Sequence, residues 1–148
     1  MKIRSLVLLL LFLLSWSAMN TALHADNGWM TDYAKALQQA HTEKKNILLD
    51  FTGSDWCFWC KKIQKDIFSQ GSFQEFAKKN LILVEVDFPQ AKEQSDVLKK
   101  QNADLQTEYG VEGFPTLILL DPNGKIIKRN TGYPHGGLEG LIEWIRKN

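Results

Sequence analysis

The chain has 148 residues, of which 44% are hydrophobic and 24% are charged, and its formal net charge is +1. This length suits one domain with a hydrophobic core of its own. The near-neutral charge provides no basic surface, so we exclude nucleic-acid binding.

The first 25 residues have the plan of a secretory signal peptide. Lys2 and Arg4 precede an apolar run over residues 6–14, and small residues follow. The apolar run is shorter than the roughly 20 residues that a membrane-spanning helix needs, although an uncleaved N-terminal anchor is the alternative. We therefore predict cleavage after residue 25 and a bacterial periplasmic location. Loss of Lys2 and Arg4 would change the formal charge from +1 to −1.

The remaining residues, 26–148, form one predicted domain in which helical and strand-like segments alternate. This alternation indicates an α/β fold. Thr31 and Asp32 can cap a first helix, and the pair Asn123-Gly124 favours a tight turn between two antiparallel strands. In chain order, we expect a helix from about 33, a strand over 46–51, a helix that Gly71 ends, a helix over 72–80, a strand over 81–88, one or two surface helices over 91–109, the antiparallel strands 115–121 and 125–130, and a closing helix over 136–148.

The surface helices over 91–109 are polar along most of their length. We expect Val97, Leu98, Leu105 and Tyr109 to form their inward side.

Cys57 and Cys60 are the only cysteines of the chain, and they are three positions apart. Two cysteines placed at random would have this spacing about once in 75 cases. The order of strand, short loop, CxxC and helix predicts that Cys57 lies in the first turn of a helix, where backbone N–H groups favour the thiolate. Cys60 would lie one turn further on, placed to attack a mixed disulfide. The pair therefore indicates thiol-disulfide exchange.

Two simpler interpretations of the cysteines remain open. A structural disulfide across three residues would close a very small loop and constrain the unfolded chain little. A zinc site normally needs four ligands, and only His24, His41 and His135 could join the two cysteines. Because residue 61 is lysine, haem attachment is excluded.

Three stretches together carry a family resemblance: "ILLDFTGSDWCFWCKK", "GFPTLILLDPNGK" and the closing helix. They resemble the thioredoxin-fold thiol-disulfide oxidoreductases of the exported kind, over nearly all of residues 30–147. The resemblance implies a single thioredoxin-like domain with a central mixed sheet flanked by helices. It also implies disulfide-containing exported proteins as substrates, a membrane-embedded redox partner, and no organic cofactor. We expect no metal, because so few further ligands are present.

The resemblance implies that Pro115 is a cis-proline that lies against the active-site cysteines. Phe114, directly before it, would offer backbone groups to an extended substrate. Because cis bonds are uncommon even before proline, the alternative is a trans proline at the start of a strand.

Asp50 lies within the apolar run 46–51, where burial would raise its pKa. The resemblance gives this carboxyl group the role of exchanging a proton with Cys60. Alternatively, Asp50 lies at a strand end and accepts hydrogen bonds from the loop that follows. One residue more separates Asp50 from Cys57 than in ordinary thioredoxins.

Bulky aromatic residues surround the cysteines. Phe58 and Trp59 replace the Gly-Pro that is best known between the cysteines of this family, at positions that tune the thiolate. Trp56 and Trp59 would form an apolar lip for extended partners, or else serve in packing. Together with Phe58, Phe114 and Pro115, they make the predicted substrate-binding set.

Charged residues flank the same motif. Asp55 can cap the helix. For Lys61 and Lys62 we prefer a solvated helix face.

The resulting prediction is a monomeric protein-disulfide reductase in which Cys57 attacks, Cys60 resolves and Asp50 moves the proton. The same cysteines could serve a disulfide oxidase or isomerase. The alternative of another class is a noncatalytic binding module that retains the fold.

Overall fold

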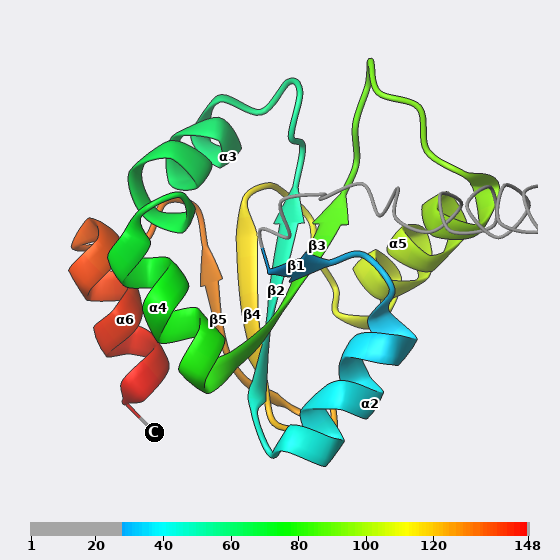
Figure 1. Ribbon diagram of the computed structural model, residues 1–148. Coiled ribbons are helices and arrows are strands. Elements are labelled where there is room, and N and C mark those ends of the chain that lie inside the picture. Colours follow the sequence, from blue (N-terminus) through cyan, green and yellow to red (C-terminus); the bar gives the residue numbers. More distant parts are fainter. Residues whose placement is uncertain (1–27, 148) are drawn as a thin grey trace, which may run out of the picture.

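The computed structural model describes residues 28–147, which build a five-stranded sheet between two layers of helices (Figure 1). The strands lie in the order β1, β3, β2, β4, β5. β3 pairs parallel with β1 and β2, whereas β4 pairs antiparallel with β2 and β5. The mixed sheet confirms the predicted α/β class. The bounds of the strands are Trp29–Met30 (β1), Asn46–Thr52 (β2), Leu81–Asp87 (β3), Thr116–Leu120 (β4) and Ile126–Thr131 (β5).

Side chains alternate across the sheet and divide the core into two parts. On one face, Leu49 of β2 packs in a cluster with residues of two helices. On the other face, Leu48 packs with residues of the remaining helices. Figure 1 shows these two layers on opposite sides of the sheet. The first layer holds α2 (Tyr33–Glu43) and α5 (Asp96–Glu108), and the second holds α3 (Phe58–Ile63), the π-helical turn η1 (Gln64–Phe68), α4 (Gly71–Asn80) and α6 (Gly137–Arg146).

The strand register brings polar residues together at one end of the sheet. Asp50 of β2 pairs with Glu85 of β3, and Thr52 pairs with Asp87. Because Asp50 and Thr52 are two and four residues beyond Leu48, their side chains face the layer that begins with α3. The chain leaves β2 at this end and enters α3 through a short loop, so polar side chains lie beneath the cysteine motif.

Most elements lie where the sequence predicted them. The strands at 46–51 and 81–88 and the antiparallel pair are confirmed, and Asp32 caps α2 by accepting a 3.1 Å hydrogen bond from the Lys35 N–H. The prediction for Gly71 is wrong, because the preceding helix ends in η1 and Gly71 is the first residue of α4.

The predicted inward side of the helix over 91–109 is wrong at one position. Val97 is 82% exposed in the first turn of α5, whereas Leu105 and Tyr109 are buried in the core. Val97 lies eight residues before Leu105, and a turn of helix takes 3.6 residues, so spacing alone allowed it to be placed on the buried side.

The predicted signal peptide, residues 1–25, lies outside the described residues. Among the helices within residues 28–147, none combines the length and apolar character needed to cross a bilayer.

Candidate active site

Cys57 and Cys60 form a disulfide at the beginning of α3. Cys57 is the N-cap residue of this helix, and its Sγ accepts a 3.2 Å hydrogen bond from the backbone N–H of Cys60. The two residues are 7% and 5% exposed, respectively. A backbone N–H directed at a sulfur stabilises negative charge there, so this geometry favours a thiolate at Cys57 in the reduced protein.

A tight turn delivers the chain from β2 to the cysteines. The backbone N–H groups of Trp56 and Cys57 both donate to the Gly53 carbonyl oxygen, at 3.2 and 2.8 Å. The Trp56 indole lies directly over Gly53, where a Cβ atom would overlap it. A side chain at this position would therefore displace the Trp56 indole or distort the turn.

Asp55 connects this turn to the loop that follows β3. Its carboxylate accepts backbone hydrogen bonds from Gln90, Ala91 and Lys92, at 2.7 to 3.0 Å. These bonds, the one from Gln90 above all, lower the pKa of Asp55 to about 2. The prediction that Asp55 caps the helix is wrong, because Cys57 takes the cap position and Asp55 instead fixes a distant loop.

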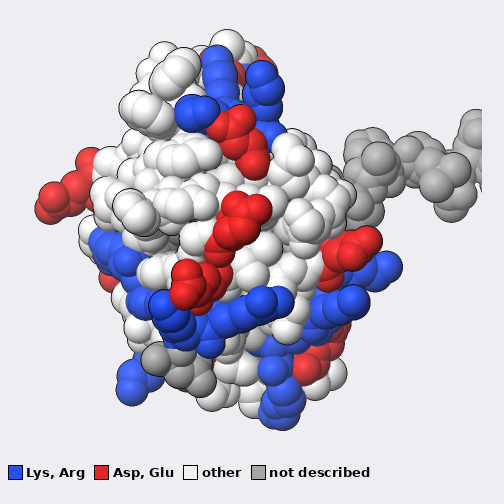
Figure 2. Space-filling model, turned by 90° about the vertical axis from the view of Figure 1, so that its left-hand side faces the viewer, with Lys and Arg blue, Asp and Glu red and all other residues white. Residues whose placement is uncertain are grey.

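Three exposed aromatic residues surround the disulfide. Trp56, Phe58 and Trp59 are 43%, 69% and 51% exposed. The Phe58 and Trp59 rings contact each other edge to face, and Trp59 also lies 6.0 Å from the ring of Tyr133. Figure 2 shows the face that carries α3, α4 and α6, where an uncharged area lies between a group of charged side chains at the top and further charged side chains below. The disulfide therefore lies among apolar side chains that are open to solvent.

Trp56 is held more firmly than its exposure suggests. Its Nε1–H donates to the Phe88 carbonyl oxygen at 2.8 Å, and its ring meets that of Phe114 edge to face at 6.0 Å. Packing and an exposed edge are thus combined in one residue: the packing alternative is confirmed for Trp56, and the lip for extended partners stays a prediction.

The segment before β4 lies beside this motif through the contact of Trp56 with Phe114. The Phe114–Pro115 peptide bond is cis. Pro115 is buried, and Phe114 stacks on Phe88 with ring centroids 4.9 Å apart. The sequence-predicted residues at 56, 114 and 115 are therefore brought together, although almost sixty residues separate them along the chain.

Asp50 lies beneath the cysteines. It is 7% exposed, and within residues 28–147 its Oδ1 has no hydrogen-bond partner. Burial, followed by repulsion from Glu85 and Asp87, raises the pKa of Asp50 to about 8. Asp50 and Cys60 line the same cavity, of about 290 Å³. A carboxyl group with this pKa can take up or release a proton near neutral pH.

The alternative in which Asp50 binds the following loop is wrong, because Asp87 does this instead. Asp87 accepts from the Ser54 N–H at 2.9 Å and from the Ser54 hydroxyl at 2.6 Å. Sequence reasoning missed both Asp87 and Glu85. The signal was available, since they are the two acidic residues of the otherwise apolar strand "LILVEVD".

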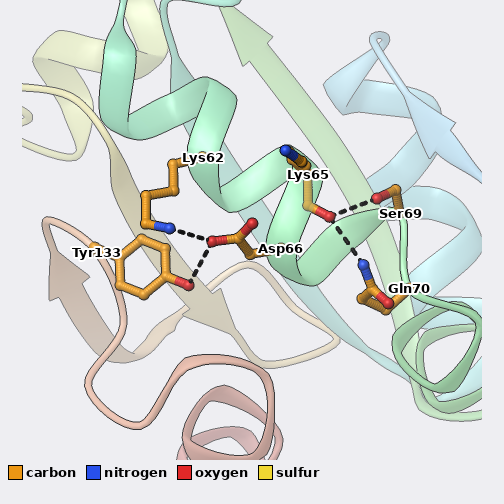
Figure 3. A network of polar contacts seen from close by, with 6 residues as sticks. All are labelled: Lys62, Lys65, Asp66, Ser69, Gln70 and Tyr133. Carbon is orange, nitrogen blue, oxygen red and sulfur yellow. Dashed lines mark hydrogen bonds and ion pairs between the residues drawn. The ribbon is translucent and has the colours of Figure 1, made fainter.

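The two lysines after the motif differ in their surroundings. Lys61 is exposed and lines the cavity that Asp50 and Cys60 share. Lys62 forms a 2.5 Å ion pair with Asp66 of η1, and the Tyr133 hydroxyl donates to the same carboxylate at 3.3 Å (Figure 3). The ion pair raises the pKa of Lys62. The solvated face predicted for both lysines therefore fits Lys61, whereas Lys62 connects α3 to the loop before α6.

Figure 3 also shows two hydrogen bonds that join η1 to the residues directly after it. The Ser69 hydroxyl and the Gln70 side-chain amide both donate to the Lys65 carbonyl oxygen, at 2.8 and 2.9 Å. These bonds satisfy a carbonyl in the last turn of η1, where helix carbonyls lack partners within the helix.

Within the part of the chain that the structure describes, no group of three or more His, Cys, Asp or Glu residues is arranged to hold a metal ion.

Comparison with known proteins agrees with this geometry. Residues 33–143 match the thioredoxin-like domain family. Disulfide bond reductase DsbH of Chlamydia pneumoniae is 44% identical over 105 residues, which are 71% of this chain and 63% of that protein. Thioredoxin-related protein DsbJ of the same organism is 30% identical over 101 residues, 68% of this chain and 29% of that protein. The match thus spans less than two thirds of the length of either relative.

A solved structure described as DsbH oxidoreductase superposes with a TM-score of 0.74 at 40% sequence identity. The superposition covers 80% of this chain and 81% of that one. Fold, paired cysteines and sequence similarity therefore agree: the chain belongs to the thioredoxin-like family of thiol-disulfide oxidoreductases.

Proposed function

We propose that this protein is exported and reduces disulfides in other exported proteins through Cys57 and Cys60. The observation that carries the proposal is the Cys57–Cys60 disulfide at the N-cap of α3, where the Cys60 N–H points at the Cys57 sulfur. A structural disulfide over so short a loop would add little stability. Exposed aromatic side chains around it favour contact with another protein.

The proposed cycle begins with the reduced protein. The Cys57 thiolate attacks one sulfur of a substrate disulfide, forms a mixed disulfide and releases the first substrate thiolate. Cys60 then loses its proton to the Asp50 carboxylate, and its thiolate attacks the Cys57 sulfur. This step restores the Cys57–Cys60 disulfide and releases the second substrate thiolate, which takes a proton from water. Two electrons pass to the substrate in all.

Substrate contacts are assigned to the aromatic surface around the disulfide. Phe58 and Trp59 offer the most exposed apolar area, and Trp56 presents one edge next to Phe114. An extended segment lying along the backbone at Phe114 and Pro115 would present its disulfide to Cys57. Aromatic side chains provide large apolar contact areas and so suit partners of varied sequence.

The direction of electron flow is taken from the relative named a disulfide bond reductase, which is 44% identical over the matched residues. Electrons would return to the Cys57–Cys60 disulfide from a membrane-embedded redox partner, as the family resemblance implies. The predicted signal peptide supports a periplasmic location, where disulfides persist in proteins. No metal or organic cofactor takes part in this cycle, and the protein would act as a monomer.

Trapping of mixed disulfides tests the exchange chemistry. A Cys60→Ser variant retains the attacking sulfur and lacks the resolving one, so it should accumulate covalent complexes with exported proteins that a reducing agent releases. The Cys57→Ser, Cys60→Ser double variant is the control and should trap none. Absence of trapped complexes, combined with no insulin reduction by the unaltered protein, would contradict the proposed exchange and favour a binding module.

The reduction potential of the Cys57–Cys60 pair tests the direction. Equilibration with glutathione should give a value near that of thioredoxin, roughly −270 mV, for a reductase. A value near roughly −120 mV would instead indicate an oxidase.

A further inference from the structure

The cavity beneath the disulfide contains a second carboxyl group, for which the proposed cycle has no role. This cavity, of about 290 Å³, holds Asp50 and Cys60 at its inner end. Glu85 also lines it and is half-buried. The residues that line the cavity are Trp29, Asp50, Thr52, Ser54, Cys60, Lys61, Gln64, Glu85 and Lys92.

Strand geometry brings Glu85 next to Asp50. The two residues are paired neighbours in the register of the parallel strands β2 and β3. Their side chains point to the same face of the sheet, because Leu48 and Leu83, two residues before each, share one core cluster. Adjacent strands lie about 4.8 Å apart, so carboxyl groups on paired residues can exchange a proton directly or through one water molecule.

The cavity connects this pair to solvent. Lys61, Gln64 and Lys92 line it and are exposed, whereas Asp50 and Cys60 are buried. The space is large enough to admit water, and its polar lining offers water hydrogen-bond partners. A proton on Asp50 therefore has a route outward, and Glu85 lies on it.

Five charged side chains act on this route. Asp50 comes from β2, Glu85 and Asp87 come from β3, Lys61 comes from α3, and Lys92 comes from the loop after β3. Asp87 is fixed by Ser54 through both of its oxygens, and Lys92 Nζ donates to the Ser54 hydroxyl at 3.0 Å. Asp50 and Glu85 are thus the two carboxyl groups that remain for proton exchange.

The electrostatics of the pair agree with this view. Burial raises the pKa of both Asp50 and Glu85, and each carboxylate that is close by disfavours a second charge. Lys92 acts in the opposite direction on Glu85 and favours its ionised form. The proton is therefore held preferentially at the inner carboxyl group, with the charge nearer the cavity mouth.

We propose that Glu85 is a proton-relay residue that carries the proton between Asp50 and solvent during resolution of the mixed disulfide by Cys60. The inference rests on the proposed function. Asp50, which holds a proton at rest, first passes it to the Glu85 carboxylate, and the resulting Asp50 carboxylate takes the proton of Cys60. Glu85 then releases the proton to water at the cavity mouth, so the protein ends the cycle with both carboxyl groups in their original states.

A first test measures the coupling of the two carboxyl groups without turnover. In the oxidised protein, the carboxyl ¹³C resonance of Asp50 is followed against pH in the unaltered protein and in Glu85→Gln. Removal of the like charge should lower the titration midpoint of Asp50 by about one pH unit. Glu75→Gln is the matched control, because Glu75 is an exposed residue of α4, and it should leave the midpoint unchanged. An equal midpoint in Glu85→Gln and the unaltered protein overturns the proposal.

A second test measures the relay itself. Reduced protein reacts with an aromatic disulfide such as dithionitrobenzoate, and the second equivalent of released thiol reports the attack of Cys60 on the mixed disulfide. Glu85→Gln should slow this second release by at least about tenfold at pH 7, with a changed pH profile. Glu85→Asp keeps the carboxyl group and should retain most of the rate. A shifted Asp50 midpoint with an unchanged rate would make Glu85 only a neighbouring charge and would overturn the relay.

The two proposals fail in different ways. If the unaltered protein releases no second equivalent of thiol, Cys60 does not resolve the mixed disulfide and the proposed function fails. If that release occurs and Glu85→Gln leaves its rate and pH profile unchanged, only the role of Glu85 fails.

Discussion

Asp50 lies in β2 and Asp55 lies five residues later, within the turn that follows, yet their surroundings have opposite effects. Asp50 is buried beneath the cysteines with an unpartnered oxygen, and its pKa is raised to about 8. Asp55 lies in the turn that carries Trp56, which we call the rim of the site. Its carboxylate accepts hydrogen bonds from three backbone N–H groups, and these bonds lower its pKa to about 2. Burial without partners stabilises the protonated form, whereas hydrogen bonds to the carboxylate stabilise the ionised form.

This difference separates two kinds of contribution to the site. A group with a pKa near 8 changes its charge under ordinary conditions, so the floor of the site can exchange protons. A group with a pKa near 2 keeps its charge at every pH at which the protein would function, so the rim is held in a fixed shape. Proton chemistry and shape are thus assigned to different carboxylates of one short segment.

The largest expected effect concerns stability and comes from Asp50→Asn. Because the ordinary pKa of 3.8 rises to about 8 on folding, the folded protein binds more protons than the unfolded chain between these values. Stability therefore falls as pH rises through this window, and Asn removes the loss. We expect Asp50→Asn to raise the free energy of unfolding at pH 7 by on the order of 4 kcal/mol, measured by urea denaturation.

The pH dependence provides the control for Asp50→Asn. Near pH 4 both side chains are largely uncharged, so the gain should almost vanish there. Asp104→Asn, at an exposed position of α5, should change the free energy of unfolding little at either pH 4 or pH 7. A gain of equal size at pH 4 and pH 7 would contradict a raised pKa at Asp50.

The sequence predicted the floor of the site better than the rim. A carboxyl group within "NILLDFT" can only be buried or break the strand, so the burial of Asp50 followed from a local pattern. Asp55 binds backbone groups 35 to 37 residues away, and no local pattern indicates where that loop will lie. The helix-capping role predicted for Asp55 was the best local alternative, and tertiary contacts replaced it.

Glu85 shows a different limit of sequence reasoning. Its position in β3 was predicted correctly, but its meaning depends on which residue of β2 lies beside it. β2 and β3 are parallel and are not joined by a hairpin, so the packing of the whole core sets their register. The pairing of Glu85 with Asp50 therefore appears only in the structure. The Phe114–Pro115 segment is similar, since the family resemblance and not the composition suggested its place beside the cysteines.

A smaller effect is expected from Gly53→Ala at the turn between floor and rim. The added methyl group would overlap the Trp56 indole, so the indole or the turn must shift. We expect a loss of about 1 to 3 kcal/mol in the free energy of unfolding, measured by urea denaturation. Gly71→Ala is the matched control, because a methyl group there meets no atom within 4 Å and should cost little.

Removal of the indole tests the steric origin of the Gly53 effect. In a Trp56→Ala background, Gly53→Ala should cost much less than in the unaltered protein, because the overlapping group is gone. Equal costs in both backgrounds would indicate backbone strain and not contact with Trp56.

The smallest expected effect comes from Asp55→Asn at the rim. An amide group replaces one carboxylate oxygen and the charge, so at least one backbone N–H of residues 90–92 loses its acceptor. Because the pKa of Asp55 is depressed on folding, its contribution is present above about pH 4 and is lost as pH falls through about 2. We therefore expect a modest drop in melting temperature at pH 7 that disappears near pH 2, with faster amide exchange at Ala91 and Lys92.

Glu93→Gln is the matched control for this change, since Glu93 is an exposed residue of the same loop and loses the same charge. It should leave amide exchange at Ala91 and Lys92 unaltered, because no hydrogen bond of these groups goes to Glu93 in the described residues. The rim also carries Trp56 directly after Asp55, so a loosened loop should expose Trp56 further without changing the titration of Asp50. A shift in the Asp50 midpoint on Asp55→Asn would show that rim and floor are coupled, and the separation of shape from proton chemistry would then be wrong.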